Sequence, residues 1–106
     1  MHTLIVEFEL RAIGTSEYEA HCDEIAPAFA EIPGLLSKLW ILDRDSGRAG
    51  GVYTWADSRS CDAYLAGATF QGLLANPALA NVRHRRFDVL ERPTDVTCGP
   101  AVSTAA

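Results

Sequence analysis

The sequence has 106 residues, of which 48% are hydrophobic and 22% charged, and its formal net charge is −5. A chain of this length predicts one domain. Its acidic balance excludes general nucleic-acid binding, because that function needs a basic patch to neutralise phosphates. The hydrophobic content is high for a small domain, whose own core is thin, so we expect a partner subunit to cover part of the apolar surface.

The three cysteines, Cys22, Cys61 and Cys98, are odd in number and are not spaced as metal ligands. We therefore expect no disulfide framework and no metal site, and we expect the first two thiols to be small buried side chains on helices. Free thiols suit a reducing cytoplasm. The N-terminal segment lacks the pattern of a secretory signal, and no apolar run is long enough to cross a bilayer, so we expect a cytoplasmic protein without membrane contact.

The first two predicted elements are a strand and a helix. Residues 3–11 alternate between apolar and polar side chains, and this period of two predicts a strand with one buried face. Ser16 and Glu19 have the spacing of a capping box, which predicts that a helix begins there. Because Pro27 lacks a backbone donor, we expect this helix to bend or to begin again near Ala26.

A β-hairpin follows, with strands predicted over residues 35–43 and 49–55 around a polar, glycine-containing loop. Lys38 and Trp40 stand two residues apart, so their side chains share one face of the first strand. A glycine pair at residues 50–51 opens the second strand. There, the missing side chains permit a bulge or a close approach of two backbones.

The C-terminal half contains a predicted helix, a short helical segment and a last strand. Asp57-Ser58 offers a cap for a helix over residues 58–68, and residues 70–76 form the second helical segment. The last strand is expected over residues 82–90. Residues 94–106 are small and polar, which predicts a flexible tail after a domain that ends at residue 93.

The predicted order is β-α-β-β-α-β, and this is the order of the ferredoxin-like class of α+β folds, a four-stranded antiparallel sheet with both helices on one face. The second strand has large apolar side chains on both of its faces. The helices can cover only one face of the sheet, so we expect a second sheet to cover the other. Two copies packed sheet to sheet about a two-fold axis form such a homodimer, a dimeric α/β barrel.

These residues carry a resemblance to a known family. The matching positions gather in the hairpin, the second helix and the last strand: Gly34-Leu35, Lys38, Trp40, Gly47, Ala49-Gly50-Gly51, Tyr53, Asp57, Ala63-Tyr64-Leu65, Phe87-Asp88-Val89 and Glu91. With them the chain resembles the YdhR-type monooxygenases, within the dimeric α/β-barrel superfamily that also contains antibiotic-biosynthesis monooxygenases. The best-known members of that last group use an asparagine, a tryptophan and a histidine. Neither Asn76 nor Asn81 aligns with that asparagine, so the triad does not carry over.

Five aromatic residues are candidates for a substrate pocket. The functional interpretation is a pocket wall for a flat aromatic or polyketide-like molecule, with hydroxyl and indole groups as polar handles. The alternative is plain core packing, since large aromatic side chains are commonly buried. The candidates are Trp40, Tyr53 and Trp55 on the hairpin, and Tyr64 and Phe70 at the junction of the two helical segments.

His84 and Lys38 are the candidate catalytic residues. Histidine is the usual general base near neutral pH, and His84 lies between arginines that can hold an anion, so it is the predicted base, with an interface histidine as the alternative. Lys38 can bind an oxyanion, but the favoured interpretation is a salt bridge to Glu7 or Glu9, because an unpaired buried charge is costly. Asp88 is a second possible base or an ion-pair partner of a neighbouring arginine.

The sequence lacks a phosphate loop, a dinucleotide fingerprint and a metal motif, so we expect no cofactor. The leading hypothesis, which draws on the resemblance, is a small dimeric monooxygenase that needs no cofactor. Its base would deprotonate an acidic phenol or 1,3-dicarbonyl, and the carbanion would reduce oxygen directly. Two alternatives stay open. One is a non-redox cyclase, isomerase or dehydratase in the same cleft, and the other is a ligand-binding module without turnover. Haem binding through His84 is less favoured.

Overall fold

The computed structural model describes residues 1–104. Its elements follow one another with short connections, as expected from the sequence, and one helix is added at the C-terminus. They are β1 (His2–Leu10), α1 (Thr15–Ala30), β2 (Leu35–Asp43), β3 (Arg48–Trp55), α2 (Ser58–Ala66), α3 (Ala68–Ala75), β4 (Leu79–Asp88) and α4 (Glu91–Thr104).

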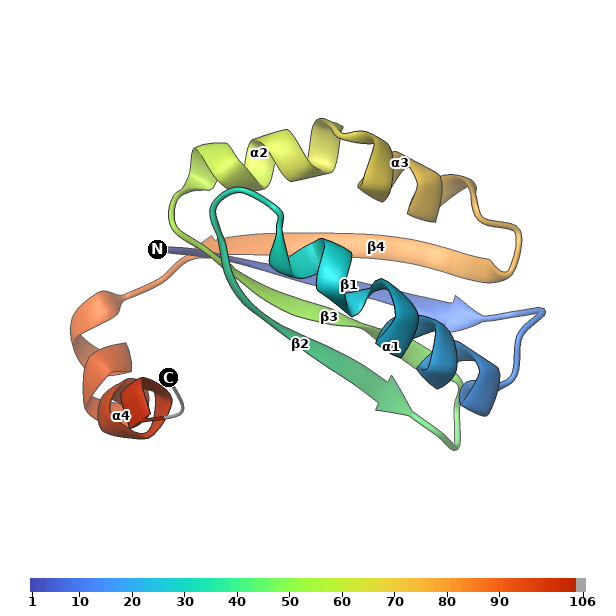
Figure 1. Cartoon of the computed structure of the whole chain (residues 1–106), viewed down its shortest axis with the longest axis horizontal. Helices are drawn as coiled ribbons and strands as arrows, with labels where there is room; N and C mark the ends of the chain where they lie inside the picture. The colour runs from blue at the N-terminus through green and yellow to red at the C-terminus, as the bar shows by residue number, and fades with distance from the viewer. Residues whose placement is uncertain (105–106) are drawn as a thin grey trace.

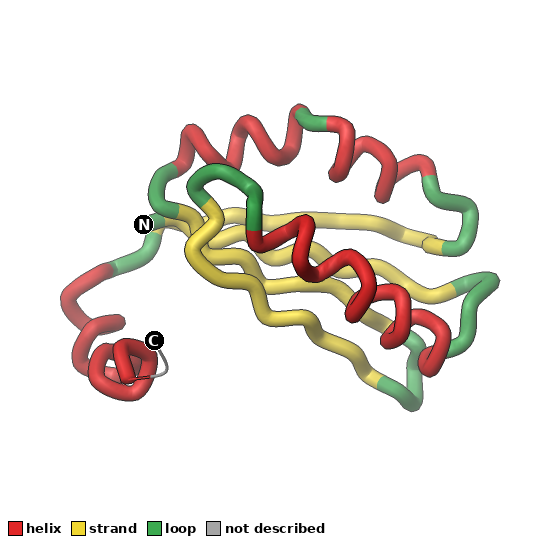
Figure 2. Tube along the Cα trace, viewed as in Figure 1, coloured by secondary structure: helices red, strands yellow, loops and turns green. Residues whose placement is uncertain are grey.

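The four strands form one antiparallel sheet in the order β2-β3-β1-β4. Helices α1, α2 and α3 lie on one face of this sheet, and α4 stands apart from both layers (Figure 1). The opposite face of the sheet carries no helix, as the trace in Figure 2 shows. The predicted ferredoxin-like α+β architecture is therefore confirmed. The homodimer stays a prediction.

The alternation in the first strand separates the two faces as expected. Leu4, Val6 and Phe8 are buried under the helices, whereas Ile5 and Glu7 between them are only partly buried on the open face. The same two faces continue on β3, because Leu4 pairs with Tyr53 and Val6 pairs with Gly51. The core therefore lies between the helices and one face of the sheet.

The N-cap of helix α1 lies two residues earlier than the sequence predicts. Gly14 is its N-cap, and the carboxylate of Glu17 accepts a hydrogen bond of 3.4 Å from the Gly14 N–H. The prediction of a cap at Ser16 was therefore wrong, because the helix already begins at Thr15 and Ser16 lies inside its first turn. The helix is also a single element through Pro27 and does not begin again near Ala26.

Helices α2 and α3 confirm the predicted cap and break. The Asp57 carboxylate accepts a hydrogen bond of 2.8 Å from the Ser60 N–H, as an N-cap should. Gly67 separates the two helices. Strand β4 starts and ends a few residues earlier than expected, at Leu79 and Asp88.

The N-terminal end of β1 makes side-chain contacts with β4. His2 is 7% exposed, its Nδ1 lies 3.0 Å from an Asp88 carboxylate oxygen, and the Arg86 Nε donates to its Nε2 at 2.9 Å. The same guanidinium also donates to the Asp62 carboxylate at 2.6 Å and to the Ser58 carbonyl at 3.0 Å. This network joins β1 and β4 to α2. It also shows that Asp88 pairs with histidine rather than with Arg83 or Arg85.

The segment expected to be a flexible tail contains a helix, and its flexibility stays a prediction. Helix α4 runs over Glu91–Thr104, with an acidic residue in its first turn, which favours a helix N-terminus. The Glu91 carboxylate also lies 2.7 Å from the amine of Met1. Residues 105–106 lie outside the described part of the chain, and the boundary at residue 93 stays a prediction. Among the helices described here, none is both long and apolar enough to span a membrane.

Candidate active site

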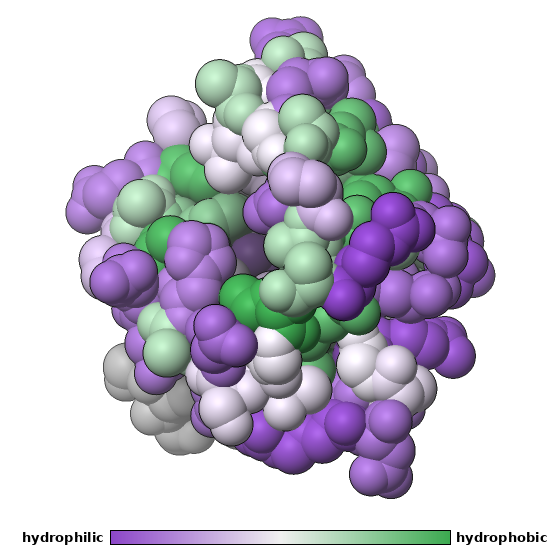
Figure 3. All heavy atoms as spheres, turned by 90° about the vertical axis from the view of Figure 1, so that its right-hand side faces the viewer, coloured by the Kyte–Doolittle hydropathy of each residue, from purple (hydrophilic) through white to green (hydrophobic). Residues whose placement is uncertain are grey.

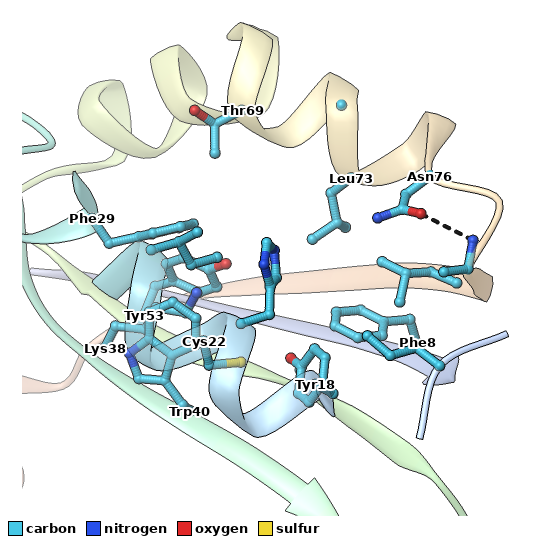
Figure 4. A pocket seen from close by; sticks show the side chains of 17 residues that line it. Phe8, Tyr18, Cys22, Phe29, Lys38, Trp40, Tyr53, Thr69, Leu73 and Asn76 are labelled. Carbon is cyan, nitrogen blue, oxygen red and sulfur yellow. Dashed lines mark hydrogen bonds between the residues drawn. The ribbon is translucent and has the colours of Figure 1, made fainter. Parts of the chain in front are cut away.

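A pocket of about 250 Å³ lies between the sheet and the helices α1 and α3. Apolar side chains gather around a hollow on this side of the molecule (Figure 3), and Figure 4 shows the lining residues from close by. Its volume falls just below the ~300–1,000 Å³ that is usual for ligand pockets, so it suits a small ligand. The polar and aromatic lining includes Tyr18, His21, Cys22, Phe29, Lys38, Trp40, Tyr53 and Asn76.

Strand β2 directs Lys38 and Trp40 to the helix-covered face, as their spacing predicts. Lys38 pairs with Tyr53, and Trp40 pairs with Gly51 on the neighbouring strand. The absent side chain at Gly51 is what makes room, because a Cβ there would lie 2.7 Å from the Lys38 Cε. The aliphatic part of the lysine thus lies across the backbone of β3.

The amine of Lys38 is surrounded by aromatic faces. Its Nζ lies 3.4 Å from the ring centroid of Trp40, 3.7 Å from that of Phe29 and 4.6 Å from that of Tyr53. All four side chains come together in Figure 4. Aromatic faces attract a cation at such distances, so the site holds a positive charge without an anionic neighbour.

The expected salt bridge of Lys38 is absent from the described part of the chain, and that prediction was wrong. Glu7 pairs instead with Arg48 at 3.2 Å, and the Glu9 carboxylate accepts a hydrogen bond from Asn81. Both glutamates lie at positions that point to the open face of the sheet, because they alternate with the buried residues of β1. Lys38 lies on the other face, out of their reach.

Burial lowers the pKa of Lys38 from 10.5 to about 7, because the ammonium loses its water. The nearby Cys22 side chain opposes this effect when it is a thiolate. At neutral pH the amine therefore exists in both its charged and its neutral form. Such a group can hold a developing anion when protonated and can act as a base or nucleophile when neutral.

Two tyrosines also contribute polar groups beside the lysine. The hydroxyls of Tyr53 and Tyr64 lie 3.0 Å apart, and burial raises the pKa of both phenols, so both stay protonated. Tyr18, on α1, has its pKa raised by burial and by the adjacent Cys22 thiol. The pocket thus offers neutral phenol donors around one titrating amine.

The five aromatic candidates divide into two groups. Trp40 and Tyr53 line the pocket, whereas Trp55, Tyr64 and Phe70 do not belong to its lining and lie in the core at its side. Trp55 is fully buried and stacks on Tyr53 at 5.9 Å, with the rings 4° from parallel. These three core residues support the pocket wall from behind, and their predicted contact with substrate stays a prediction.

His84 lies outside the pocket lining. It stands at the far end of one cross-sheet row, in which Trp40 pairs with Gly51, Gly51 with Val6, and Val6 with His84. At the ~4.8 Å spacing of neighbouring strands, its Cα lies roughly 14 Å from that of Trp40. The imidazole is exposed and packs edge-on against Phe70 at 5.5 Å. Its role as base therefore stays a prediction, and its place outside the pocket lining does not favour it.

Residues 3–100 match the family described as "Putative mono-oxygenase ydhR". The chain belongs to the ydhR family. This match confirms the resemblance that the hairpin residues carry, and it covers every element that forms the pocket. A comparison with curated proteins gives no significant match.

Solved structures share the fold of this ydhR-family chain. SnoaB from Streptomyces nogalater, described as a cofactor-independent oxygenase, has a TM-score of 0.66 and 23% identity, over 85% of this chain and 93% of its own. The heme-degrader MhuD from Mycobacterium tuberculosis, solved with two hemes in its active site, has a TM-score of 0.67 and 21% identity, over 85% and 96%. A "putative antibiotic biosynthesis monooxygenase" from Deinococcus radiodurans has a TM-score of 0.69 and 16% identity, over 86% and 94%.

The structure adds pocket residues of this ydhR-family chain that the sequence did not single out. His21 lines the pocket from α1, next to the apolar stripe of that helix. Asn76 lines it from the end of α3, where its side-chain oxygen accepts a hydrogen bond of 2.9 Å from the Ala78 N–H (Figure 4). A polar residue at the border of an apolar helix stripe is the one signal that could have pointed to His21. Among the residues described, no group of three or more His, Cys, Asp or Glu could hold a metal ion.

Proposed function

We propose that this ydhR-family protein is a cofactor-independent monooxygenase that oxidises an aromatic or polyketide-like compound in the pocket between α1 and α3. The observation that carries this proposal is the amine of Lys38, held against three aromatic rings at the wall of a small apolar pocket. The family and the fold shared with a cofactor-independent oxygenase support it.

The lining of the pocket supports this substrate class. The rings of Trp40, Phe29 and Tyr53 offer flat apolar surfaces to a planar molecule. A substrate with a methylene group next to carbonyl groups, such as an anthrone or an aryl 1,3-diketone, loses a proton to give an enolate. Protonated Lys38 would stabilise that enolate, and the neutral phenol of Tyr53 would donate to its oxygen.

The reaction balances without an external reductant. A base removes one proton from the substrate methylene, and the carbanion passes one electron to oxygen. The two radicals combine into a peroxide, which loses water and leaves a ketone, so one methylene and one O2 become one carbonyl and one water. The protein would orient the substrate, stabilise the anion and exclude bulk water.

The base in this proposal is His21, because a general base must reach the proton that it removes. His21 lines the same pocket as Lys38, whereas His84 does not. Matched variants of the two histidines separate the assignments. Loss of turnover in His21→Ala with full activity in His84→Ala supports the pocket histidine, and the reverse result restores His84 as the base.

We also propose that two copies pack through the open faces of their sheets. One row of the sheet, in which Leu39 pairs with Val52 and Val52 with Ile5, presents apolar side chains on that face. Phe87 and Ile41 extend the apolar surface, and Leu39 and Phe87 are 66% and 49% exposed in a single chain. An apolar surface of this kind favours a self-complementary interface.

The deciding experiment measures oxygen uptake and product mass with anthrones and aryl 1,3-diketones. For wild type, we expect one O2 consumed per substrate and a ketone as the product. For Lys38→Met, we expect a rate at least about tenfold lower, because the transition state loses more than ~1.4 kcal/mol of stabilisation by the charge. Conversion without oxygen uptake would replace the oxygenase with a non-redox isomerase or cyclase. Binding without any product would leave a ligand-binding module.

A further inference from the structure

Lys38 is the only lysine of the chain. The other eight residues of the lysine and arginine total are arginines, and none of them lines the pocket. Lysine and arginine differ chemically, because a guanidinium stays charged in proteins whereas a buried ammonium readily loses its proton. The chain thus has a single side-chain amine, and the fold places it inside a pocket.

This amine has no anionic partner that would keep it protonated. Within the described part of the chain, Lys38 forms no ion pair and no side-chain hydrogen bond, and its closest neighbours are the rings of Trp40 and Phe29. An incoming ligand therefore has no hydrogen bond or ion pair of the Nζ to break in that part of the chain. The pocket beside it is large enough for a small aromatic molecule.

We propose that Lys38 is a nucleophile that forms an imine with an aromatic aldehyde or ketone bound in this pocket. This activity goes beyond the proposed oxygenase, since it needs neither oxygen nor a carbon acid. A carbonyl compound is the fitting ligand class because its polar atom reacts with the amine, while its ring lies among apolar and aromatic side chains.

The step is an addition followed by loss of water. The Nζ lone pair attacks the carbonyl carbon and forms the C–N bond, and the carbonyl oxygen takes up a proton. The resulting carbinolamine then loses that oxygen as water, which carries away both original amine hydrogens. No atom changes its oxidation state overall. The pocket supplies a proton carrier in the imidazole of His21, and the Tyr53 hydroxyl can donate a hydrogen bond to the carbonyl oxygen.

Two properties of the site favour this reaction, one acting on the free amine and the other on the imine product. Burial brings the pKa of Lys38 to about 7, so ~50% of the amine is neutral and nucleophilic at that pH. The product imine becomes a cation when it is protonated. The aromatic faces that surround Nζ stabilise this cation without any carboxylate.

The test is reductive trapping under nitrogen. The full chain is incubated at pH 7 with 2-naphthaldehyde and then with sodium borohydride, which converts an imine into a stable secondary amine. Intact-mass measurement and peptide mapping should place one naphthylmethyl group on Lys38. We expect labelling at least about tenfold faster in the folded chain than in the chain unfolded in urea, where the lysine has its ordinary pKa.

The controls use the only other amine and two substitutions. The amine of Met1 lies outside the pocket, in an ion pair with Glu91, and peptide mapping separates its adduct from that of Lys38. Lys38→Arg keeps a cation and Lys38→Met keeps an apolar chain, and both should abolish the pocket adduct. The proposal is overturned if folded wild type is labelled only at Met1, or no faster at Lys38 than the unfolded chain. Because oxygen is absent, this outcome is independent of the oxygenase proposal.

Discussion

Lys38 is the residue on which both proposed reactions depend. Its ammonium gains from three aromatic rings but loses its water, and desolvation is the larger effect because the pKa falls to about 7. The unfolded chain keeps the ordinary lysine pKa of 10.5. Below pH 7 the folded state therefore carries the full cost of burying a charge. Between about pH 7 and 10.5 the unfolded state binds the extra proton, so stability rises with pH through this range.

The first prediction concerns the substitution Lys38→Met. It removes the buried charge, so we expect the variant to be more stable than wild type by up to ~5 kcal/mol at pH 6, because the pKa falls from 10.5 to about 7 and each unit of pKa depression corresponds to ~1.4 kcal/mol. The gain should shrink as the pH approaches 10.5. Urea unfolding at a series of pH values measures it.

Two controls accompany this measurement. Arg11→Met replaces an exposed basic residue and should leave the pH dependence unchanged. Isotopic labelling of lysine gives one side-chain resonance, since Lys38 is the only lysine, and its titration midpoint should lie near pH 7. A midpoint near 10.5 would contradict the assigned environment of the amine.

At the scale of the elements, strand β3 is what joins the site to the fold. Its two adjacent glycines have different neighbours, although the sequence presents them as one pair. A Cβ at Gly50 would clash with the backbone oxygen of Val6, whereas a Cβ at Gly51 would meet the Lys38 side chain. The expected close backbone approach is thus confirmed at Gly50, and the missing side chain at Gly51 leaves room for Lys38.

The second prediction compares Gly50→Ala with Gly51→Ala. The first substitution forces β1 and β3 apart and should cost about 3 kcal/mol or more, at the upper end of overpacking effects. The second displaces the flexible end of Lys38, with a smaller shift of the Tyr53 ring, and should cost about 1–2 kcal/mol. Urea unfolding measures both.

A functional difference should accompany the difference in stability. Gly51→Ala should fold and yet label at Lys38 at least about tenfold more slowly than wild type, because the displaced amine leaves its aromatic surroundings. Equal labelling of wild type and Gly51→Ala would show that this glycine does not position the lysine.

The whole molecule leaves one large face of its sheet without a covering layer. Helices α1, α2 and α3 lie on the opposite face (Figure 1). The large side chains of Leu39 and Phe87 remain exposed on the open face, which also bears Val52 and Ile5. This arrangement is the physical basis of the proposed homodimer.

The third prediction introduces a charge into this face. Leu39 is 66% exposed in the single chain, so Leu39→Glu should barely affect the fold but should prevent sheet-to-sheet packing. Light scattering at micromolar concentration should report a dimer for wild type and a monomer for the variant. Leu74→Glu, at an exposed position of α3, is the matched control and should remain dimeric. A wild-type monomer would refute the dimer.

Local patterns in the sequence were enough to predict the architecture. The alternation in β1, the Asp57 cap and the glycine-containing hairpin depend on residues close together in the chain. Such signals survive in a single sequence because each element largely follows its own periodicity. They also placed Lys38 and Trp40 on one face of β2.

The tertiary structure alone decided which residues meet at that face. Phe29 of α1 and Lys38 of β2 come together only because the helix packs over the sheet, and Gly51 of β3 leaves the space between them. The same holds for His2, buried by Asp88 and Arg86 from the far end of the chain, and for His84, carried to the opposite edge. Strand register and helix packing depend on residues far apart in the chain. For this reason the sequence predicted a salt bridge for Lys38, whereas the structure buries its amine among aromatic rings.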